Sequence, residues 1–166
     1  TPCGTLFPYT TLFRSGSLIK SGGLTNHTSR LYRAVVAEKF AADIDATLIP
    51  TIDPSLYHLS ATVLPGHTPA EVEQVILDEI DRVRQEPISD EELAKAKRQA
   101  RALFAYSSES ITNQGFWLGF SEIFADHEWF LTYLDRLDAV TADDVLRVAQ
   151  TYLRPQNRTV GHYISI

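Results

Sequence analysis

Two aspartates offer this chain's most suggestive spacing for acid–base or cation chemistry. Asp43 and Asp45 alternate with Ala42 and Ile44, so in an extended strand both carboxylates would share one face. Paired carboxylates can transfer protons or hold a cation. They can equally form the hydrated polar face of an edge strand. Because no histidine lies beside them in the sequence, we favour the hydrated face.

The histidines lack the spacing of a metal site. His127-Glu128 resembles the start of a His-Glu-x-x-His helix, but the fifth position is Leu131. No two histidines are separated as ligands on one helical turn, and tetrahedral zinc sites require clustered donors. The sequence therefore predicts no zinc site and no bound cofactor within this chain.

Alternating and helical patterns indicate the elements that position these residues. Residues 42–48 and 57–63 alternate as two half-buried strands joined by a turn, and 158–164 is a third strand candidate. Helical periods cover 29–39, 89–107, 112–124 and 129–137, and two further helices begin after Thr68 and Thr141. Thr68 and Glu71 form a capping-box pattern, which Ser89 and Glu92 repeat. The predicted fold class is α+β: an antiparallel β-sheet covered by several α-helices and truncated at the N-terminus.

Composition restricts the function classes. The 166 residues suffice for one domain with a real core. A formal charge of −6 argues against nucleic acid or an anionic membrane as the main partner, and no apolar run is long enough to span a bilayer. The single Cys3 cannot form an internal disulfide, so cysteine usage does not indicate a redox compartment.

The first residues look foreign to the domain. The chain contains no methionine, which suggests part of a longer protein. Residues 5–15, Thr-Leu-Phe-Pro-Tyr-Thr-Thr-Leu-Phe-Arg-Ser, resemble a translated sequencing adapter and lack the features of a secretory signal. We therefore expect 1–15 to be an artefactual, unstructured segment and 16–166 to form the domain, itself incomplete.

An aromatic block allows two interpretations. Phe116, Phe120 and Phe124 recur at helical spacing, which fits a core stripe, and Gly115 and Gly119 would allow close helix approach. Clustered aromatics also anchor interfaces, so a peptide-binding or inter-domain surface is the alternative.

Several segments together resemble one family of peptidases. In order along the chain they are Gly22-Gly23 with Ser29-Arg30-Leu31-Tyr32-Arg33, Leu64-Pro65-Gly66, Glu91-Glu92-Leu93-Ala94-Lys95-Ala96-Lys97, Leu137 to Val145, and Tyr152 to Val160. From Gly16 onward the chain is similar to the second (C-terminal) domain of one half of a pitrilysin/insulinase (inverzincin) metallopeptidase. The resemblance implies a zinc endopeptidase of two halves that enclose a peptide substrate in a chamber.

Departures from the family pattern limit what the resemblance implies here. The family's His-x-x-Glu-His zinc motif is absent, so the zinc would belong to a missing upstream, N-terminal domain. In many members of the family the second domain carries an Arg and a Tyr that help to hold the substrate carbonyl. Here the corresponding positions lie near Val36 and Ala42, and neither residue type is present. The resemblance thus implies a non-catalytic domain of a zinc enzyme, which forms the chamber wall and contacts the N-terminal domain and the other half. The alternative is a non-catalytic structural or partner subunit of the same family.

Four residues are candidates for the chamber or an interface. Arg30 and Tyr32 lie in the segment most specific to the family, and Asp43 and Asp45 would favour basic peptides if their strand face lines the chamber.

Overall fold

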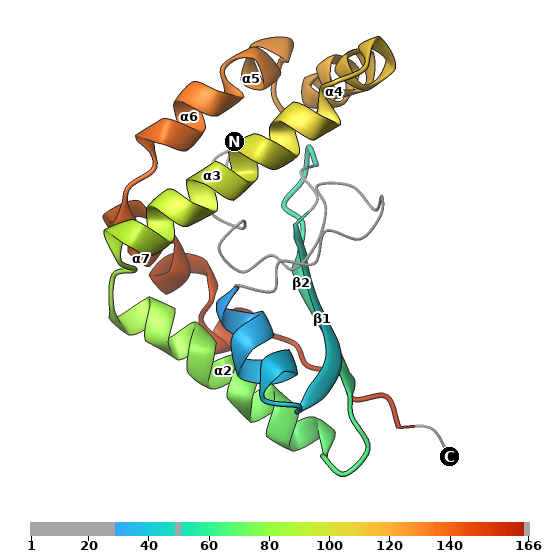
Figure 1. Ribbon diagram of the computed structural model, residues 1–166, viewed down its shortest axis with the longest axis vertical. Coiled ribbons are helices and arrows are strands. Elements are labelled where there is room, and N and C mark those ends of the chain that lie inside the picture. The colour runs from blue at the N-terminus through green and yellow to red at the C-terminus, as the bar shows by residue number, and fades with distance from the viewer. Residues whose placement is uncertain (1–28, 49–50, 165–166) are drawn as a thin grey trace.

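The fold is α+β, as the sequence predicts. The structure, a computed structural model, describes residues 29–48 and 51–164. Strands β1 (Ala41–Leu48) and β2 (Tyr57–Val63) form an antiparallel two-stranded sheet. The helices are η2 (Tyr32–Ala37), α2 (Pro69–Gln85), α3 (Asp90–Ser107), α4 (Ile111–Phe124), α5 (His127–Leu131), α6 (Tyr133–Ala139), α7 (Ala142–Tyr152) and the 3₁₀ turn η3 (Pro155–Asn157). In Figure 1, α3 runs obliquely from α2 and α7 at one end toward α4 at the other, α6 lies alongside it, and the hairpin lies to one side.

A register irregularity in β1 changes which side chains face the core. Ile44 and Ala46 are each 1% exposed and pair with Ala61 and Leu59. Between Ala41 and Asp43 the register shifts, so Ala41 is buried while Ala42 is exposed. The alternating pattern predicts that Ala42 is buried, and this prediction is wrong. An extra residue in one strand turns the side chains before it to the opposite face of the sheet.

The short helix before β1 is fixed by its buried face and its C-terminal cap. Leu31 and Val35 are 0% exposed, which is the helical spacing that the sequence shows. The helix ends in a Schellman motif: the amide of Phe40 donates to the carbonyl of Val35 at 2.9 Å, and the amide of Lys39 to Val36 at 3.0 Å. Lys39 consequently adopts φ 65°, a left-handed conformation that favours glycine.

Lys39→Gly is expected to stabilise the protein. Glycine adopts the left-handed conformation without the Cβ strain that lysine bears, so the free energy of unfolding should rise by about 0.5–1 kcal/mol. Urea denaturation measures the change. Glu38→Gly is the matched control, because Glu38 has φ −81° and glycine there should only lower stability. Equal effects of the two substitutions would contradict the role of the cap.

Two of the predicted helix starts are complete capping boxes. Thr68 with Glu71, and Thr141 with Asp144, exchange side-chain and backbone hydrogen bonds in both directions. At the start of α3 only half of the box forms, because the Ser89 hydroxyl accepts from the amide of Glu92 at 3.2 Å while the Glu92 carboxylate bonds elsewhere.

The capping boxes predict a loss of stability in acid. The backbone amide of Thr68 lowers the pKa of Glu71, and the Thr141 hydroxyl, followed by Arg147, lowers the pKa of Asp144. A carboxylate whose pKa is depressed in the folded state stabilises the fold above its unfolded pKa of about 4 and loses that contribution as pH falls through the folded value. Unfolding free energy measured from about pH 6 down to about pH 3 should therefore decline. It should decline less steeply in the double variant Glu71→Gln/Asp144→Asn, and an unchanged slope would contradict the prediction.

The buried side chains form two clusters. The hairpin cluster joins η2, β1, α2 and α7, and its buried members are Leu31, Val35, Ala41, Ile44, Val72, Val83, Ile88, Ala96, Val140, Val145 and Ala149. The aromatic cluster joins α3 to α6, and its buried members are Ala100, Trp117, Phe124, Trp129, Phe130, Tyr133 and Leu137. Helix α3 contributes Ala96 to the first and Ala100 to the second, so it connects the two.

The aromatic block is mainly core, but the predicted stripe is only partly right. Phe124 is 3% exposed and Phe116 is 49% exposed. Steps of four residues advance 40° beyond a full helical turn, so a row of three such residues winds around the helix. The row that faces inward on α4 is Trp117, Ser121 and Phe124.

Two predicted elements differ in the structure. The helix expected over 129–137 is divided at Thr132 into α5 and α6. The strand expected over 158–164 is wrong: these residues are exposed and form no strand. The residue types of this segment favour a strand, but a strand forms only when its backbone hydrogen-bonds to a neighbouring strand. The sheet in the described residues contains only β1 and β2. Among the described residues no helix has the length and apolar character needed to cross a bilayer.

Candidate functional site

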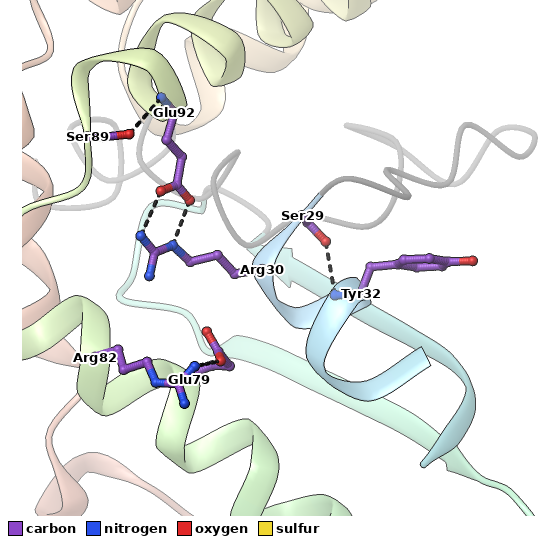
Figure 2. A network of polar contacts seen from close by, with 7 residues as sticks. All are labelled: Ser29, Arg30, Tyr32, Glu79, Arg82, Ser89 and Glu92. Carbon is purple, nitrogen blue, oxygen red and sulfur yellow. Dashed lines mark hydrogen bonds and ion pairs between the residues drawn. The ribbon is translucent and has the colours of Figure 1, made fainter. Parts of the chain in front are cut away.

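A bidentate ion pair joins two distant segments that both carry the family resemblance. The Arg30 guanidinium donates from Nε to Oε1 of Glu92 at 2.6 Å and from Nη2 to Oε2 at 2.7 Å, across 62 positions of sequence. The side chains are 26% and 23% exposed, so the pair is partly shielded from water. Figure 2 shows the guanidinium and the carboxylate facing each other between η2 and α3. This paired geometry is the strongest that arginine makes with a carboxylate.

A second acidic group, from α2, lies close enough to act on Arg30. The Glu79 side chain is 10% exposed and is paired with Arg82 one turn later on the helix. The hydrogen bond to Glu92 is the main cause that raises the pKa of Arg30, while burial opposes it and the charges of Glu92, Glu79 and Glu86 add to the rise. Hydrogen bonds thus join the segment of η2 to α3, whereas Glu79 of α2 acts on Arg30 only through its charge (Figure 2).

The Arg30–Glu92 ion pair stabilises the fold and is not arranged for catalysis. A raised pKa keeps Arg30 charged, and both oxygens of the Glu92 carboxylate already accept hydrogen bonds from it. The Arg30 guanidinium is therefore not poised to release a proton near neutral pH. The arrangement clamps the segment that leads into β1.

Tyr32 is part of a different set of contacts. Its backbone amide donates to the Ser29 hydroxyl at 3.2 Å, which caps the start of the helix. Its ring points away from Arg30 in Figure 2 and is half-buried. The structure thus places these two candidate residues two positions apart on one helix without joining their side chains.

Asp43 and Asp45 lie on the polar face of the hairpin, opposite the face formed by Ile44 and Ala46. They pair across the sheet with Thr62 and Ser60, and Asp45 Oδ2 accepts from the Thr47 hydroxyl at 2.8 Å. Asp43 is exposed and Asp45 half-buried. Their direct cross-strand neighbours carry hydroxyl groups, and His58, opposite Thr47, lies further along the same face.

Each described histidine with a polar side-chain contact meets one carboxylate. His127 Nδ1 lies 2.9 Å from Glu122 and His162 Nε2 lies 3.0 Å from Glu73, while His67 lies 3.8 Å from Glu71. Across residues 29–48 and 51–164, no three side chains of His, Cys, Asp or Glu are grouped to hold a metal ion.

The two positions where the family's substrate-assisting Arg and Tyr would fall carry small or apolar groups. Val36 is half-buried and packs against the hairpin cluster. Ala42 is exposed beside the register irregularity of β1. Neither side chain can donate a hydrogen bond to a substrate carbonyl.

Comparison with known proteins agrees with this description. Residues 11–100 match the family model described as the peptidase M16 inactive domain. The structure is similar to that of a candidate zinc protease from Bordetella pertussis Tohama I, with 26% identity and a TM-score of 0.79, over 98% of this chain and 84% of that one.

Two further structures share the fold. The inactive peptidase domain of a candidate zinc protease from Bordetella parapertussis has a TM-score of 0.80 and 24% identity, over 99% of this chain and 85% of that one. A protease from Helicobacter pylori has a TM-score of 0.78 and 18% identity, over 93% of this chain and 36% of that one. The comparison with curated proteins gives no match.

This chain belongs to the M16 peptidase family, through its inactive domain. The family resemblance seen in the sequence, to pitrilysin/insulinase-type zinc peptidases, is therefore confirmed.

The sequence contains a signal for one further member of this group of charges, Glu79. Glu79 interrupts an apolar helical stripe between Ile76 and Val83, and a charge in such a stripe indicates a buried group that needs an ion-pair partner. The Arg30–Glu92 pair had no comparable signal, because two residues 62 positions apart are brought together only by the tertiary fold.

Proposed function

We propose that this chain is the non-catalytic second domain of one half of an insulinase/pitrilysin-type zinc endopeptidase. The match to the inactive M16 domain over residues 11–100 carries the proposal. The candidate zinc protease from Bordetella pertussis, 26% identical, supports it. In this proposal the domain is formed by residues 16–166, and zinc, attacking water and general base come from an upstream N-terminal domain that carries His-x-x-Glu-His.

The domain's role would be to build part of the chamber wall and to contact the N-terminal domain and the other half. The Arg30–Glu92 clamp supports this role, because it holds η2 against α3 and so orders the entry to β1. The partners are then the N-terminal domain, the second half or subunit, and a peptide substrate.

An activity assay tests the assignment of the chemistry. Purified chain should cleave no fluorogenic peptide in a zinc-dependent manner and should retain no stoichiometric zinc after dialysis, because the described residues offer no grouped ligands. The same chain joined to its natural upstream coding region should gain cleavage that a chelator abolishes. Zinc-dependent cleavage by the chain alone would refute the proposal.

The upstream coding region also separates the two candidate roles. A first domain with His-x-x-Glu-His supports the enzyme, and a first domain without it supports the structural or partner subunit.

A finer part of the proposal concerns the polar face of the hairpin. If Asp43 and Asp45 line the chamber, the double reversal Asp43→Lys/Asp45→Lys should shift the assembled enzyme's preference from basic toward acidic peptides. Asp135→Lys, an exposed reversal on α6, is the control. Unchanged preference in the double variant would remove these aspartates from the substrate path and leave the domain assignment intact.

A further inference from the structure

The outward face of α4 is apolar and has no packing partner in the part of the chain that the structure describes. Phe116 is 49% exposed and Ile123 is 51% exposed, and Gly115 and Gly119, four residues apart, are exposed on the same side of the helix. The buried row of α4 lies on the opposite side. Glu122 is the only charged residue of this helix. Exposed apolar side chains gathered on one side of a helix mark a surface where a partner packs.

The two glycines are not required by the packing of this chain. A Cβ atom built at Gly115 or Gly119 would meet no heavy atom within 4 Å among the contacts that the structure describes. Glycine weakens the interior of a helix, so its presence there calls for a reason outside the described fold. Close approach of another helix is the usual reason, since small residues let two backbones come together.

The chain at α4 is acidic: Glu122 lies on the helix, and Glu109 and Asp126 lie just beyond its two ends. Residues 106–135 contain no lysine or arginine. Their acidic side chains are all exposed: Glu109, Glu122, Asp126, Glu128 and Asp135. The same segment exposes further apolar side chains, namely Tyr106, Ile111 and Leu131. An apolar surface with an acidic border is complementary to an apolar surface with a basic border.

We infer that the outward face of α4 is a docking surface for an amphipathic helix of a partner protein whose apolar stripe is flanked by lysine or arginine. The stripe packs on Phe116, Gly119 and Ile123, and the basic flanks meet the acidic border. A second copy of this chain would set acidic borders against each other, and an anionic membrane would be repelled in the same way. Charge therefore selects a basic protein partner. The inference does not depend on the proposed peptidase function.

Model peptides test the chemistry directly. The probe is a fluorescently labelled helical peptide with a leucine stripe flanked by lysines. One control peptide replaces the lysines by glutamates, and another scrambles the sequence so that no stripe remains. Fluorescence anisotropy with the full chain at about 0.15 M salt should show the lysine peptide binding at least about tenfold more tightly than either control. Equal binding of the scrambled peptide would overturn the inference, because charge alone would then explain the affinity.

Variants locate the binding to α4. Gly119→Leu fills open space and should leave the far-ultraviolet circular dichroism unchanged, yet it blocks close approach of a partner helix. Ile123→Gln removes apolar surface. Each should weaken binding of the lysine peptide by about tenfold. Tyr163→Gln, at a 92% exposed residue outside α4, is the control and should leave binding unchanged.

Three other results would overturn the inference. The first is wild-type affinity in folded Gly119→Leu. The second is sedimentation showing a dimer that Gly119→Leu abolishes, which would assign the face to a second copy. The third is binding to phosphatidylserine vesicles that Ile123→Gln abolishes, which would assign it to a membrane.

Discussion

Tyr133→Ala is expected to lower the free energy of unfolding by about 3–5 kcal/mol, the range for losing a large buried aromatic side chain. Tyr133 is 2% exposed at the centre of the aromatic cluster. Its ring stacks on Phe104 with 4.9 Å between centroids and an interplanar angle of 18°, and it lies 5.4 Å from the ring of Trp129. Because small domains are stable by only about 5–15 kcal/mol, this loss removes a large share of the total.

Urea denaturation measures the effect with two independent signals. The chain's two tryptophans, Trp117 and Trp129, are both buried in the aromatic cluster, so fluorescence reports on that cluster while circular dichroism reports on all helices. Tyr106→Ala, at a 69% exposed tyrosine of α3, is the matched control and should change stability by less than about 0.5 kcal/mol. Similar losses in the two variants would contradict the placement of Tyr133 in the core.

Arg30→Ala is expected to cost about 1–3 kcal/mol, since it leaves the shielded Glu92 carboxylate without its bidentate partner. The substitution also removes the positive charge that lies among the carboxylates of Glu92, Glu79 and Glu86. Arg30→Lys should recover only part of the loss, because an ammonium group cannot make two parallel hydrogen bonds to one carboxylate.

A double-mutant cycle isolates the ion pair from other effects of each substitution. The coupling energy of Arg30→Ala with Glu92→Ala should be about 1–2 kcal/mol. The control cycle uses Arg101 and Asp138, whose side chains are 49% and 47% exposed, and should give less than about 0.5 kcal/mol. Equal coupling in the two cycles would mean that the Arg30 pair contributes no more than an ordinary surface pair.

Local structure was predictable wherever adjacent residues decide it. Thr68 with Glu71 predicts a capping box that the structure contains, because both hydrogen bonds are made within one helical turn. The alternation from Ile44 to Leu48 predicts the buried face of β1, because strand geometry sends successive side chains to opposite sides.

The candidate site was predictable only in part. Arg30 could be singled out because it lies in a segment typical of the family, but its partner could not. Glu92 has the sequence position of a capping-box residue, and the local pattern predicts a bond back to Ser89. The structure shows the Glu92 carboxylate on Arg30 instead, because a charged partner at 2.6 Å outcompetes a backbone amide.

The sequence by itself determined the class of fold, the capped starts of α2, α3 and α7, and the family, because each can be read from local patterns along the chain. Tertiary structure alone decided the Arg30–Glu92 clamp, the exposure of Ala42 and the exposure of the outward face of α4. It also decided that residues 158–164 form no strand. Each of these depends on which distant segment lies alongside, and a strand, an ion pair or a buried face exists only when that neighbour is in place.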